Sequence, residues 1–525
     1  MATYIDEDLV VVRAERSAKS RRKTVLAFGD RVDVLGEQDG WTEVRLVERW
    51  EGADVGFIRG SPRVRDEGVL RFSMIDVQQG DGMIIETPAG RIMFVDGGDN
   101  QLFARHAAAR FRYRQSSAAE PLEVAAIVVT HGDADHYDGL NDIVRSETDS
   151  SIAARKRLFI HPRRVCHSGL VTRPTKDAQR KRIRDEDKFG RSMEVGDELL
   201  ALDLYDDPRD ADEDMANEPF KRWRKSLDHW ETRGPIDVRR VAFGMDAAEI
   251  FDFLHDEGIE VELQGPFTTD VEDPESGAMV PALPYFHEAS KSPEPHLGAA
   301  TGGGDPSASH TINGHSIAFR LTFGNVRFGF TGDLNQESMD RMLDHLTPAQ
   351  LEAEIVKAPH HGSSDFDFRA LEAMRPVVAI VSSGDENAMK EYVHPRATLM
   401  AALGKCMRDR TGIVLVTELA AFFTVRRDCH SREDLAAFFR QRKDETFTGE
   451  QLRKLFAGKP KAEGPAGSFF GFERTNFGII HIRTDGERVL VFTHSGREDL
   501  NEAYRFRVTM VADERQVAFE NVESR

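Results

Sequence analysis

The sequence predicts a mixed α/β (α+β) fold that follows a small all-β domain. Short alternating strands separated by glycine turns fill residues 1–66, and apolar β-branched runs alternate with helical patterns from residue 68 onward. In addition, the 525 residues exceed what one compact core holds. We therefore expect at least two domains, with the first boundary between residues 66 and 68.

The first domain is marked by short strands that end at Gly and Asp-Gly turns. The segment GDRVDVLGEQDGWTEVRL (29–46) places an Asp-Gly pair between two alternating runs, as expected for a β-hairpin, and a later strand ends in GFI (56–58). This pattern resembles a bacterial SH3-like domain, which implies a small barrel with an unknown protein or peptide partner. Trp41 is expected to be either a core residue or a contact for that partner.

The second domain begins with strands at hairpin spacing. The runs RFSMIDVQQ (71–79), GMIIETP (82–88) and RIMFVDGG (91–98) are separated by turns that contain glycine. A further run, LEVAAIVVT (122–130), is continuous and β-branched, as a buried strand is. We expect these segments to form a first sheet.

Potential metal ligands follow this buried strand directly. The segment THGDADHYDG (130–139) holds His131, Asp133, Asp135 and His136, and a helix is expected from Asp138. Neutral imidazole nitrogens and anionic carboxylate oxygens on a strand-to-helix turn are what a divalent cation requires. The alternative, a polar turn with chance histidines, does not explain so dense a pattern.

Three later segments extend the pattern. They are FGFTGDL (328–334), VKAPHHGSS (356–364) and Ser383-Gly384 followed by His394-Pro395. Together with DVQQGD and DGG upstream, this order resembles the metallo-β-lactamase superfamily, in particular the soluble hydrolase domain of the ComEC competence proteins. The resemblance implies an αββα sandwich as the hydrolase core, over residues 68–425. ComEC proteins are membrane channels, and this chain shows no apolar run of spanning length, so DNA uptake is not implied.

The resemblance also implies a centre that binds two divalent cations. Asp96 would orient its histidines by hydrogen bonding without touching a metal. Because Asp133 stands where the common family pattern has histidine, the added carboxylate favours Mn²⁺, with Zn²⁺ or Mg²⁺ as alternatives. The implied ligands are His131 and Asp133 for the first metal, Asp135 and His136 for the second, Asp333 as the bridge and His394 as the last histidine.

Other residues are implied as catalytic or substrate-binding groups. His360 and His361 join Asp135 as catalytic residues, since a histidine at this point in related phosphodiesterases contacts the scissile phosphate or protonates the leaving oxygen; either could instead bind a metal. Lys357, Ser363 and Ser364 are expected to donate to phosphate oxygens. The usual histidine ligand between the first motif and Asp333 has no clear counterpart, and the candidates are His161, His310 and His315.

Composition divides the rest of the chain. Residues 266–312 are rich in Pro, Gly and Ser and predict a long flexible loop. Residues 426–467 combine a charged helical pattern with a linker and predict an insertion. Residues 468–525 then predict C-terminal strands and a tail that complete the hydrolase fold, with the second sheet completed near residues 470–495.

Charge and cysteine content limit the setting. The net charge of −20 argues against a uniformly basic protein that coats nucleic acid, although a local basic groove remains compatible with it. Three dispersed cysteines give neither a disulfide framework nor zinc-finger spacing. Without a recognisable secretory signal or spanning segment, we expect a cytoplasmic protein with no membrane contact.

The leading functional hypothesis is a metal-dependent nuclease or phosphodiesterase that acts on DNA through a hydroxide bound by two metals, in defence or genome maintenance. The alternative is a hydrolase of the same fold for a small-molecule ester, lactone or phosphodiester. A third class is a non-catalytic binding protein whose metal site is vestigial. Basic segments at 152–192 and 221–225 distinguish the nuclease from the small-molecule hydrolase. They are either solvated faces or a phosphate-tracking surface with Trp223 stacked on a base.

Overall fold

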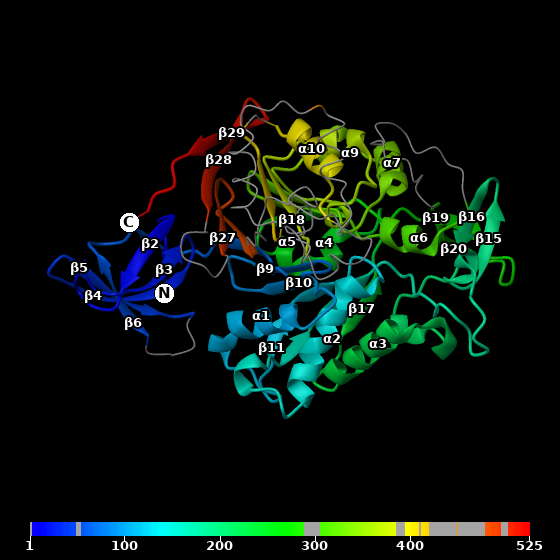
Figure 1. The fold of residues 1–525 in the computed structure, drawn as a ribbon, viewed down its shortest axis with the longest axis horizontal. Helices are drawn as coiled ribbons and strands as arrows, with labels where there is room; N and C mark the ends of the chain where they lie inside the picture. The colour runs from blue at the N-terminus through cyan, green and yellow to red at the C-terminus, as the bar shows by residue number, and fades with distance from the viewer. Residues whose placement is uncertain are drawn as a thin grey trace.

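The structure, a computed structural model, describes residues 3–48, 54–287, 305–384, 394–408, 411–418, 448, 478–494 and 502–524. Within these residues the chain is a mixed α/β protein, as predicted, with sheets of seven, ten, six, four and two strands. The seven-stranded sheet lies at one end, the ten- and six-stranded sheets lie in the middle, and the four-stranded sheet lies at the other end (Figure 1).

The N-terminal sheet is antiparallel, and alternate side chains on its strands are buried. Val10 and Val12 point into a small aliphatic core, as the period of two along a strand requires. The expected hairpin turn lies at Asp39 and Gly40, whose φ angles of 53° and 76° suit a type I′ turn. Trp41, at the start of the next strand, is half-buried. The strands, in the order β3-β2-β6-β5-β4-β1-β7, are β1 (Thr3–Ile5), β2 (Leu9–Arg13), β3 (Arg22–Ala27), β4 (Arg31–Gln38), β5 (Trp41–Leu46), β6 (Val55–Arg59) and β7 (Val64–Arg65).

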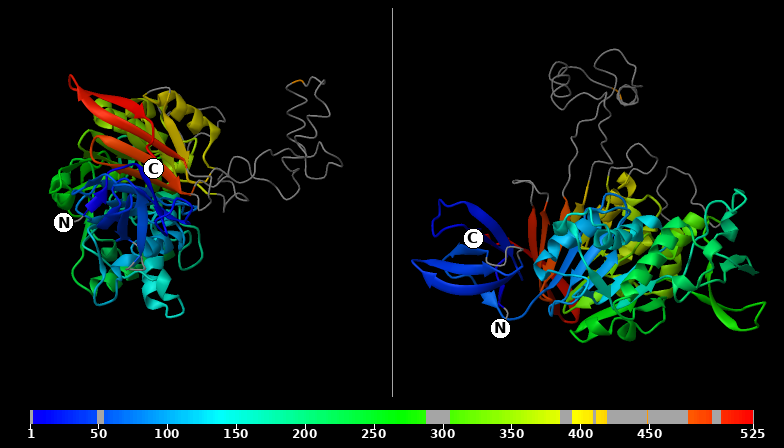
Figure 2. Two further views of the ribbon diagram at one scale, coloured as in Figure 1. Left: turned by 90° about the vertical axis from the view of Figure 1, so that its left-hand side faces the viewer. Right: turned by 90° about the horizontal axis from the view of Figure 1, so that it is seen from below.

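This sheet packs against the C-terminal strands, and we call the contact the junction. Its apolar part joins Phe28 to Val69 and Leu490. The guanidinium of Arg483 donates to the Phe28 carbonyl and to Asp30 Oδ1, both at 2.7 Å. Seen from below, the N-terminal strands and the C-terminal strands lie side by side (Figure 2). Further ion pairs join the N-terminal domain to the ten-stranded sheet, among them Arg71–Glu48, Arg488–Asp6 and Arg505–Asp8.

The ten-stranded sheet combines strands from both ends of the chain. Strand β26 pairs with β8, with Ile480 opposite Met74 and Ile482 opposite Phe72. The prediction that residues near 470–495 complete the second sheet is therefore wrong for the described part of that range: β26 and β27 extend the first sheet, because the apolar face of β26 matches that of β8. The strands, in spatial order, are β17 (Asp237–Arg240), β14 (Arg164–His167), β12 (Ala126–Val128), β10 (Ile92–Asp96), β9 (Gly82–Glu86), β8 (Leu70–Met74), β26 (Ile479–Thr484), β27 (Arg488–His494), β28 (Ala503–Val511) and β29 (Glu514–Glu520).

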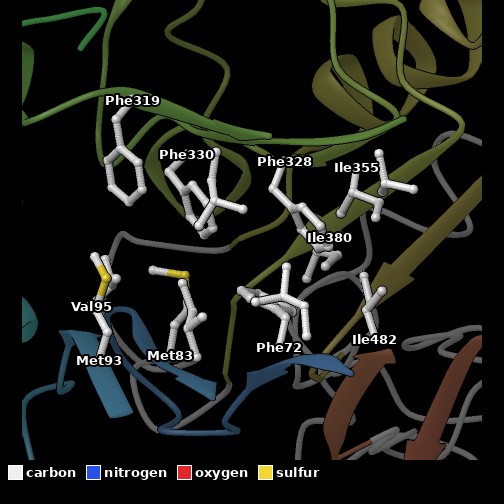
Figure 3. Close-up of a cluster of buried hydrophobic side chains, with 14 of the residues drawn as sticks. Phe72, Met83, Met93, Val95, Phe319, Phe328, Phe330, Ile355, Ile380 and Ile482 are labelled. Carbon is white, nitrogen blue, oxygen red and sulfur yellow. The ribbon is translucent and has the colours of Figure 1, made fainter. Parts of the chain in front are cut away.

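The six-stranded sheet faces the ten-stranded sheet across the main hydrophobic core. Figure 3 shows Phe319, Phe328 and Phe330 pointing from one sheet toward Met83 and Phe72 on the other. Burial of these faces against one another is what fixes the two sheets in place. The strands, in spatial order, are β18 (Ile259–Leu263), β21 (Phe319–Phe323), β22 (Val326–Phe330), β23 (Ile355–Lys357), β24 (Val378–Val381) and β25 (Ile413–Val416).

Helices cover the outer faces of both sheets, so that the order of layers is helix, sheet, sheet, helix (Figure 1). The ten-stranded sheet is covered by α1 (Leu102–Arg110), α2 (Ala134–Thr148) and α3 (Glu218–Glu231). The six-stranded sheet is covered by α7 (Gln336–His345), α8 (Pro348–Leu351), α9 (Phe368–Met374) and α10 (Ala397–Cys406). Two short helices precede β18: α4 (Ala247–Ile250) and α5 (Asp252–His255).

The four-stranded sheet corrects the prediction of a loop over residues 266–312. Its strands, in spatial order, are β15 (Ser192–Val195), β16 (Glu198–Ala201), β20 (Met279–Pro284) and β19 (Thr269–Glu272), and α6 (Ala308–Gly314) follows. Val271 and Ala282 pack with Leu200 and Leu202 in a small core, which the Pro- and Gly-rich composition concealed. Residues 288–304 lie outside the described part of the chain.

Smaller elements complete the described fold. Strands β11 (Leu122–Val124) and β13 (Ile160–Pro162) form a parallel pair. The predicted insertion at 426–467 lies outside the described residues, except for Thr448. Among the helices that the structure describes, none has both the length and the apolar character of a membrane span. Single 3₁₀ turns are η1 (Arg112–Arg114), η2 (Ala154–Lys156), η3 (Asp185–Asp187), η4 (Pro208–Asp210), η5 (Glu213–Met215) and η6 (His360–Gly362).

Candidate metal centre

The ligand-rich loop follows strand β12 at the carboxyl edge of the ten-stranded sheet. Thr130 fixes its start, because the Thr130 backbone N–H and hydroxyl each donate to Asp96, both at 2.7 Å. Helix α2 begins at Ala134, earlier than the predicted start at Asp138. Gly132 is required here, since a Cβ at this position would lie 2.6 Å from the ring of Phe220. The loop is thus held by hydrogen bonds to Asp96 at Thr130 and by packing against α3 at Gly132.

Residues from both sheets meet in one buried group. Asp81, His136, Asp333 and His361 each offer a ligand atom, and these atoms lie within 4.8 Å of one another. Asp333 Oδ2 lies 3.3 Å from His136 Nε2 and 2.9 Å from His361 Nε2, and the two nitrogens are 3.2 Å apart. Asp135 lies beside them, with Oδ2 3.7 Å from His361 Nε2. The structure therefore brings the predicted residues Asp135, His136, Asp333 and His361 together.

Each of the three deepest histidines has a polar neighbour at its Nδ1 atom, through a hydrogen bond for His131 and His136 and through a charge contact for His361. His136 Nδ1 lies 2.9 Å from Asp96 Oδ2, which agrees with the expected orienting role of Asp96. His131 Nδ1 lies 3.2 Å from the Ser316 hydroxyl oxygen, and His361 Nδ1 lies 3.3 Å from Asp81 Oδ1. Metal-binding histidines in proteins are usually fixed in this way by a second partner on the other ring nitrogen.

Asp81 is a site residue that the sequence prediction missed, although it lies in the quoted DVQQGD segment. Its position could have been inferred, because Asp81 lies in the turn between β8 and β9, and these strands belong to the sheet whose edge carries the first ligand motif. Gly80 shows how closely that turn approaches the ligand loop: a Cβ there would lie 1.6 Å from the Asp135 carbonyl oxygen. Gly80 also has a φ of 91°, which an L side chain rarely adopts.

Lys357 lies inside this group and not at its surface. Its side chain is 1% exposed, and the ammonium forms an ion pair with Asp81. It also donates to the Gly332 carbonyl at 2.7 Å and lies 3.5 Å from Asp333 Oδ1. The contact of Lys357 with a substrate stays a prediction, and the structure adds two carboxylates as its neighbours.

A rim of partly exposed residues surrounds the deep group. His360 Nε2 lies 3.9 Å from Asp333 Oδ2 and 3.3 Å from the Asn313 amide nitrogen, and the rings of His360 and His394 are 6.0 Å apart. His360 and His361 have φ angles of 45° and 51°, and such strain is concentrated at functional sites in proteins. Three further predicted residues are also partly or fully exposed: Asp133 and Ser363 are half-buried, and Ser364 is exposed.

None of the three candidates for the missing histidine ligand belongs to the four-residue group. His161 lies 3.3 Å from the Gly234 carbonyl, and His315 lies 2.7 Å from the Pro284 carbonyl. His310 Nε2 lies 3.4 Å from Asp365 Oδ2. The side chain that α6 brings to His360 is Asn313, whose Oδ1 atom is buried without a hydrogen-bond partner.

Electrostatics in the group are those of carboxylates packed against protonated imidazoles. Burial would raise the pKa of Asp81, but the Lys357 ammonium and His361 outweigh it and hold the pKa at about 2. Burial would lower the pKa of His361, but Asp333 and Asp81 raise it to about 10. Burial and the neighbouring Asp135 carboxylate raise the pKa of Asp133 to about 7. The protons on His361 and Asp133 therefore offset the negative charge of the carboxylates, as a bound metal cation would.

The donor set fits a divalent cation. His131 Nε2, Asp333 Oδ1 and Asn313 Oδ1 are buried without a hydrogen-bond partner. Buried polar atoms in proteins are rarely left so, and several in one place indicate a bound group. Imidazole nitrogen together with carboxylate oxygen suits Mn²⁺, Zn²⁺ or Mg²⁺. The buried group can therefore hold a metal ion.

The two basic segments differ in how their charges are used. On α3, Arg222 pairs with Asp138, and Lys221 pairs with Glu213 and Glu218. Trp223 is 2% exposed and packs on Tyr137, so the alternative in which it stacks on a base is wrong.

In residues 171–188, by contrast, exposed Lys176, Arg180 and Lys181 have no ion pair among the described residues. We call these three residues the basic loop. Thr172 accepts a hydrogen bond from Asn217 N–H, 2.9 Å, at the start of α3. The segment that leads into the basic loop is thus joined at Thr172 to the helix that packs on Gly132.

Comparisons with known proteins identify no family: no family model matches the chain, and no curated protein is significantly similar to it.

Proposed function

We propose that this protein is a metal-dependent phosphodiesterase that cleaves DNA, with the αββα fold of the metallo-β-lactamase superfamily and closest in motif order to the ComEC hydrolase domain. The observation that carries the proposal is the convergence of His136, His361 and Asp333 from two facing sheets, with orphaned buried donors beside them.

The layering of the molecule supports the proposed superfamily. Two sheets face each other with helices outside, and the site lies where parallel strands of both sheets end. Asp96 ends β10, the ligand loop follows β12, and Asp333 follows β22. The N-terminal sheet, with its small aliphatic core, supports the proposed SH3-like domain in the same way.

The chain's own residues divide the work of phosphodiester cleavage. Divalent cations held by the group would supply a nucleophilic water of lowered pKa and neutralise charge on the phosphate. Asp96 and Thr130 keep the ligand loop in place, so that little reorganisation is needed during the reaction. His360 and Asn313, at the rim, are positioned to donate to a phosphate oxygen or to the leaving oxygen.

The basic loop favours DNA over a small phosphodiester. Its three exposed cations follow Thr172, whose carbonyl accepts from the Asn217 N–H at the start of α3, and they are free of carboxylate partners among the described residues. Cations arranged in this way gain counterion-release energy from a polymeric phosphate backbone and little from a single phosphate.

The test compares cleavage of linear, circular and single-stranded DNA and RNA in Mn²⁺, Mg²⁺ or Zn²⁺ by the wild type and by Asp135→Ala. We expect Mn²⁺-supported DNA cleavage that the variant loses. Equal cleavage by both proteins would place the activity elsewhere. Hydrolysis of bis(4-nitrophenyl) phosphate without cleavage of any nucleic acid would favour a small-molecule hydrolase, and absence of metal binding would favour a non-catalytic protein.

A charge-matched pair of variants tests the choice of substrate. Replacing Lys176, Arg180 and Lys181 with Gln should weaken DNA binding and reduce its salt dependence, since each lost phosphate contact lowers the slope by about one. The control replaces three exposed cations of the N-terminal domain, Lys19, Arg21 and Arg22, with Gln. Equal DNA affinity of the two triple variants would remove the basic loop from the proposal.

A further inference from the structure

Two histidines of the centre are supported in parallel ways. His136 presents Nε2 to Asp333 and Nδ1 to Asp96, and His361 presents Nε2 to Asp333 and Nδ1 to Asp81. Both carboxylates are fully buried. Since Asp96 lies behind His136 as seen from Asp333, Asp81 occupies the corresponding place behind His361.

The two carboxylates differ in what neutralises them. Asp96 accepts two hydrogen bonds from Thr130, one from the backbone and one from the hydroxyl. Asp81 has no such donor among the described residues, and its side-chain partners there are His361 and the ammonium of Lys357. Lys357 ends strand β23, is itself buried and is fixed by the Gly332 carbonyl.

This arrangement disfavours Asp81 as a metal ligand, although its oxygens lie within 4.8 Å of the other ligand atoms. A cation bound to Asp81 would lie next to the Lys357 ammonium, and two positive charges in a buried site repel each other strongly. The ammonium already has Asp81 as its counterion. The carboxylates of Asp133, Asp135 and Asp333 are not engaged by Lys357 at such short range and remain for metals.

We propose that Asp81 and Lys357 are a positioning pair: Asp81 holds the His361 ring with Nε2 toward the centre, and Lys357 keeps Asp81 out of the metal's ligand set. This inference rests on the proposed metal-dependent function and adds residues to that same site. It assigns Lys357 a role inside the protein, in place of a contact with substrate.

Metal stoichiometry and affinity test the proposal without reference to cleavage. Full-length, metal-stripped protein is titrated with Mn²⁺ in a calorimeter, for the wild type, Asp81→Asn, Asp96→Asn and Asp135→Asn. We expect Asp81→Asn to keep the wild-type number of Mn²⁺ ions and to bind them about 10–100-fold more weakly, as Asp96→Asn does, because loss of an orienting partner typically has this effect. Asp135→Asn, which removes a predicted ligand, should lose one ion.

Two results would overturn the proposal. If Asp81→Asn loses one Mn²⁺ ion, as Asp135→Asn does, Asp81 is a ligand. If Asp81→Asn binds with wild-type affinity, it does not position His361. A wild type that binds no divalent cation contradicts the proposed function itself, whereas the first two results leave that function intact.

A second variant removes the risk that Asp81→Asn does not fold. Leaving the Lys357 ammonium buried without its counterion is destabilising, but the double variant Asp81→Asn with Lys357→Gln removes both charges. It should retain the wild-type number of Mn²⁺ ions with weakened affinity. Loss of one ion in this double variant would again make Asp81 a ligand.

Discussion

The junction and the metal centre are both buried clusters of charge, but their balance differs. At the junction each arginine lies against a carboxylate, as Arg483 does with Asp30 and Arg505 with Asp8. The centre has five aspartates but one permanent cation, Lys357, which contacts Asp81 and Asp333; the five are Asp81, Asp96, Asp133, Asp135 and Asp333. A matched cluster holds domains together by itself, whereas an unmatched one depends on bound protons or metal ions. The comparison predicts that only the centre responds to metal.

The largest effect is expected from Asp333→Asn. Asp333 contacts both His136 and His361, so its loss should lower kcat/KM for DNA cleavage by roughly 10³-fold or more, since metal-ion stabilisation is worth several kcal/mol. The rise in melting temperature on adding Mn²⁺ should also disappear. Asp138→Asn, on α2, is the control, because Asp138 pairs with Arg222 and lies outside the four-residue group. Equal loss in both variants would show that removing any carboxylate near the ligand loop has this effect.

A variant at the junction should lose stability to the same extent with and without metal. Arg483→Met leaves Asp30 without its nearest guanidinium and should lower the free energy of unfolding by about 3–5 kcal/mol, as breaking a buried pair does. Urea unfolding should give the same loss in Mn²⁺ and in EDTA. A loss that depends on metal would mean that the two clusters are coupled, and would end the distinction between them.

The third expected effect is a reversal of the pH dependence of stability on metal removal. Asp333 and Asp81 raise the pKa of His361 from 6.5 to about 10, so the metal-free folded state binds a proton that the unfolded state loses. The stability that His361 contributes is then full below pH 6.5 and falls as pH rises toward 10, by at most about 1.4 kcal/mol per pH unit. Asp133, with its pKa raised to about 7, acts with the same sign between pH 3.8 and 7.

With saturating Mn²⁺ the sign should change, since metal binding displaces these protons and is favoured at higher pH. Urea unfolding at pH 6.5, 8 and 9.5, with EDTA or with Mn²⁺, measures both slopes. Parallel slopes in the two conditions would mean that no metal replaces the proton on His361. His361→Asn is the control, because it should flatten the metal-free slope above pH 7.

Local sequence patterns predicted the ligand loop well. The β-branched run before Thr130 forms two short strands, β11 and β12, in place of the single strand predicted; β12 is fully buried, and the ligands follow it. Asp81 and Lys357 were harder to assign. A single acid in a turn has no local signature of burial, and lysine is the residue type least expected inside a protein. Only the approach of β23 to the turn at Gly80, far apart in sequence, buries the two together.

One error had a signal in the sequence that composition masked, and a second had none. Phe220, Trp223, Leu227 and Trp230 recur at helical spacing, which places Trp223 on the apolar face of α3 despite the basic residues around it. The sheet that β26 joins had no such signal. Its partner β8 lies about 400 residues earlier, as the contact between Ser73 and His481 shows, and one strand does not encode its neighbour.

The smallest expected effect concerns the support of the centre from α3. The Asn217 side chain caps this helix by accepting from Phe220 N–H, and Phe220 packs on Gly132 in the ligand loop. Asn217→Ala should lower the free energy of unfolding by about 1 kcal/mol, whereas Asn217→Ser should retain most of the cap. Because the cap stabilises the turn that carries Phe220, Mn²⁺ affinity should fall with Asn217→Ala and recover with Asn217→Ser. If affinity is unchanged while stability falls, α3 covers the ligand loop without holding it, and the centre depends on Asp96 and Thr130 alone.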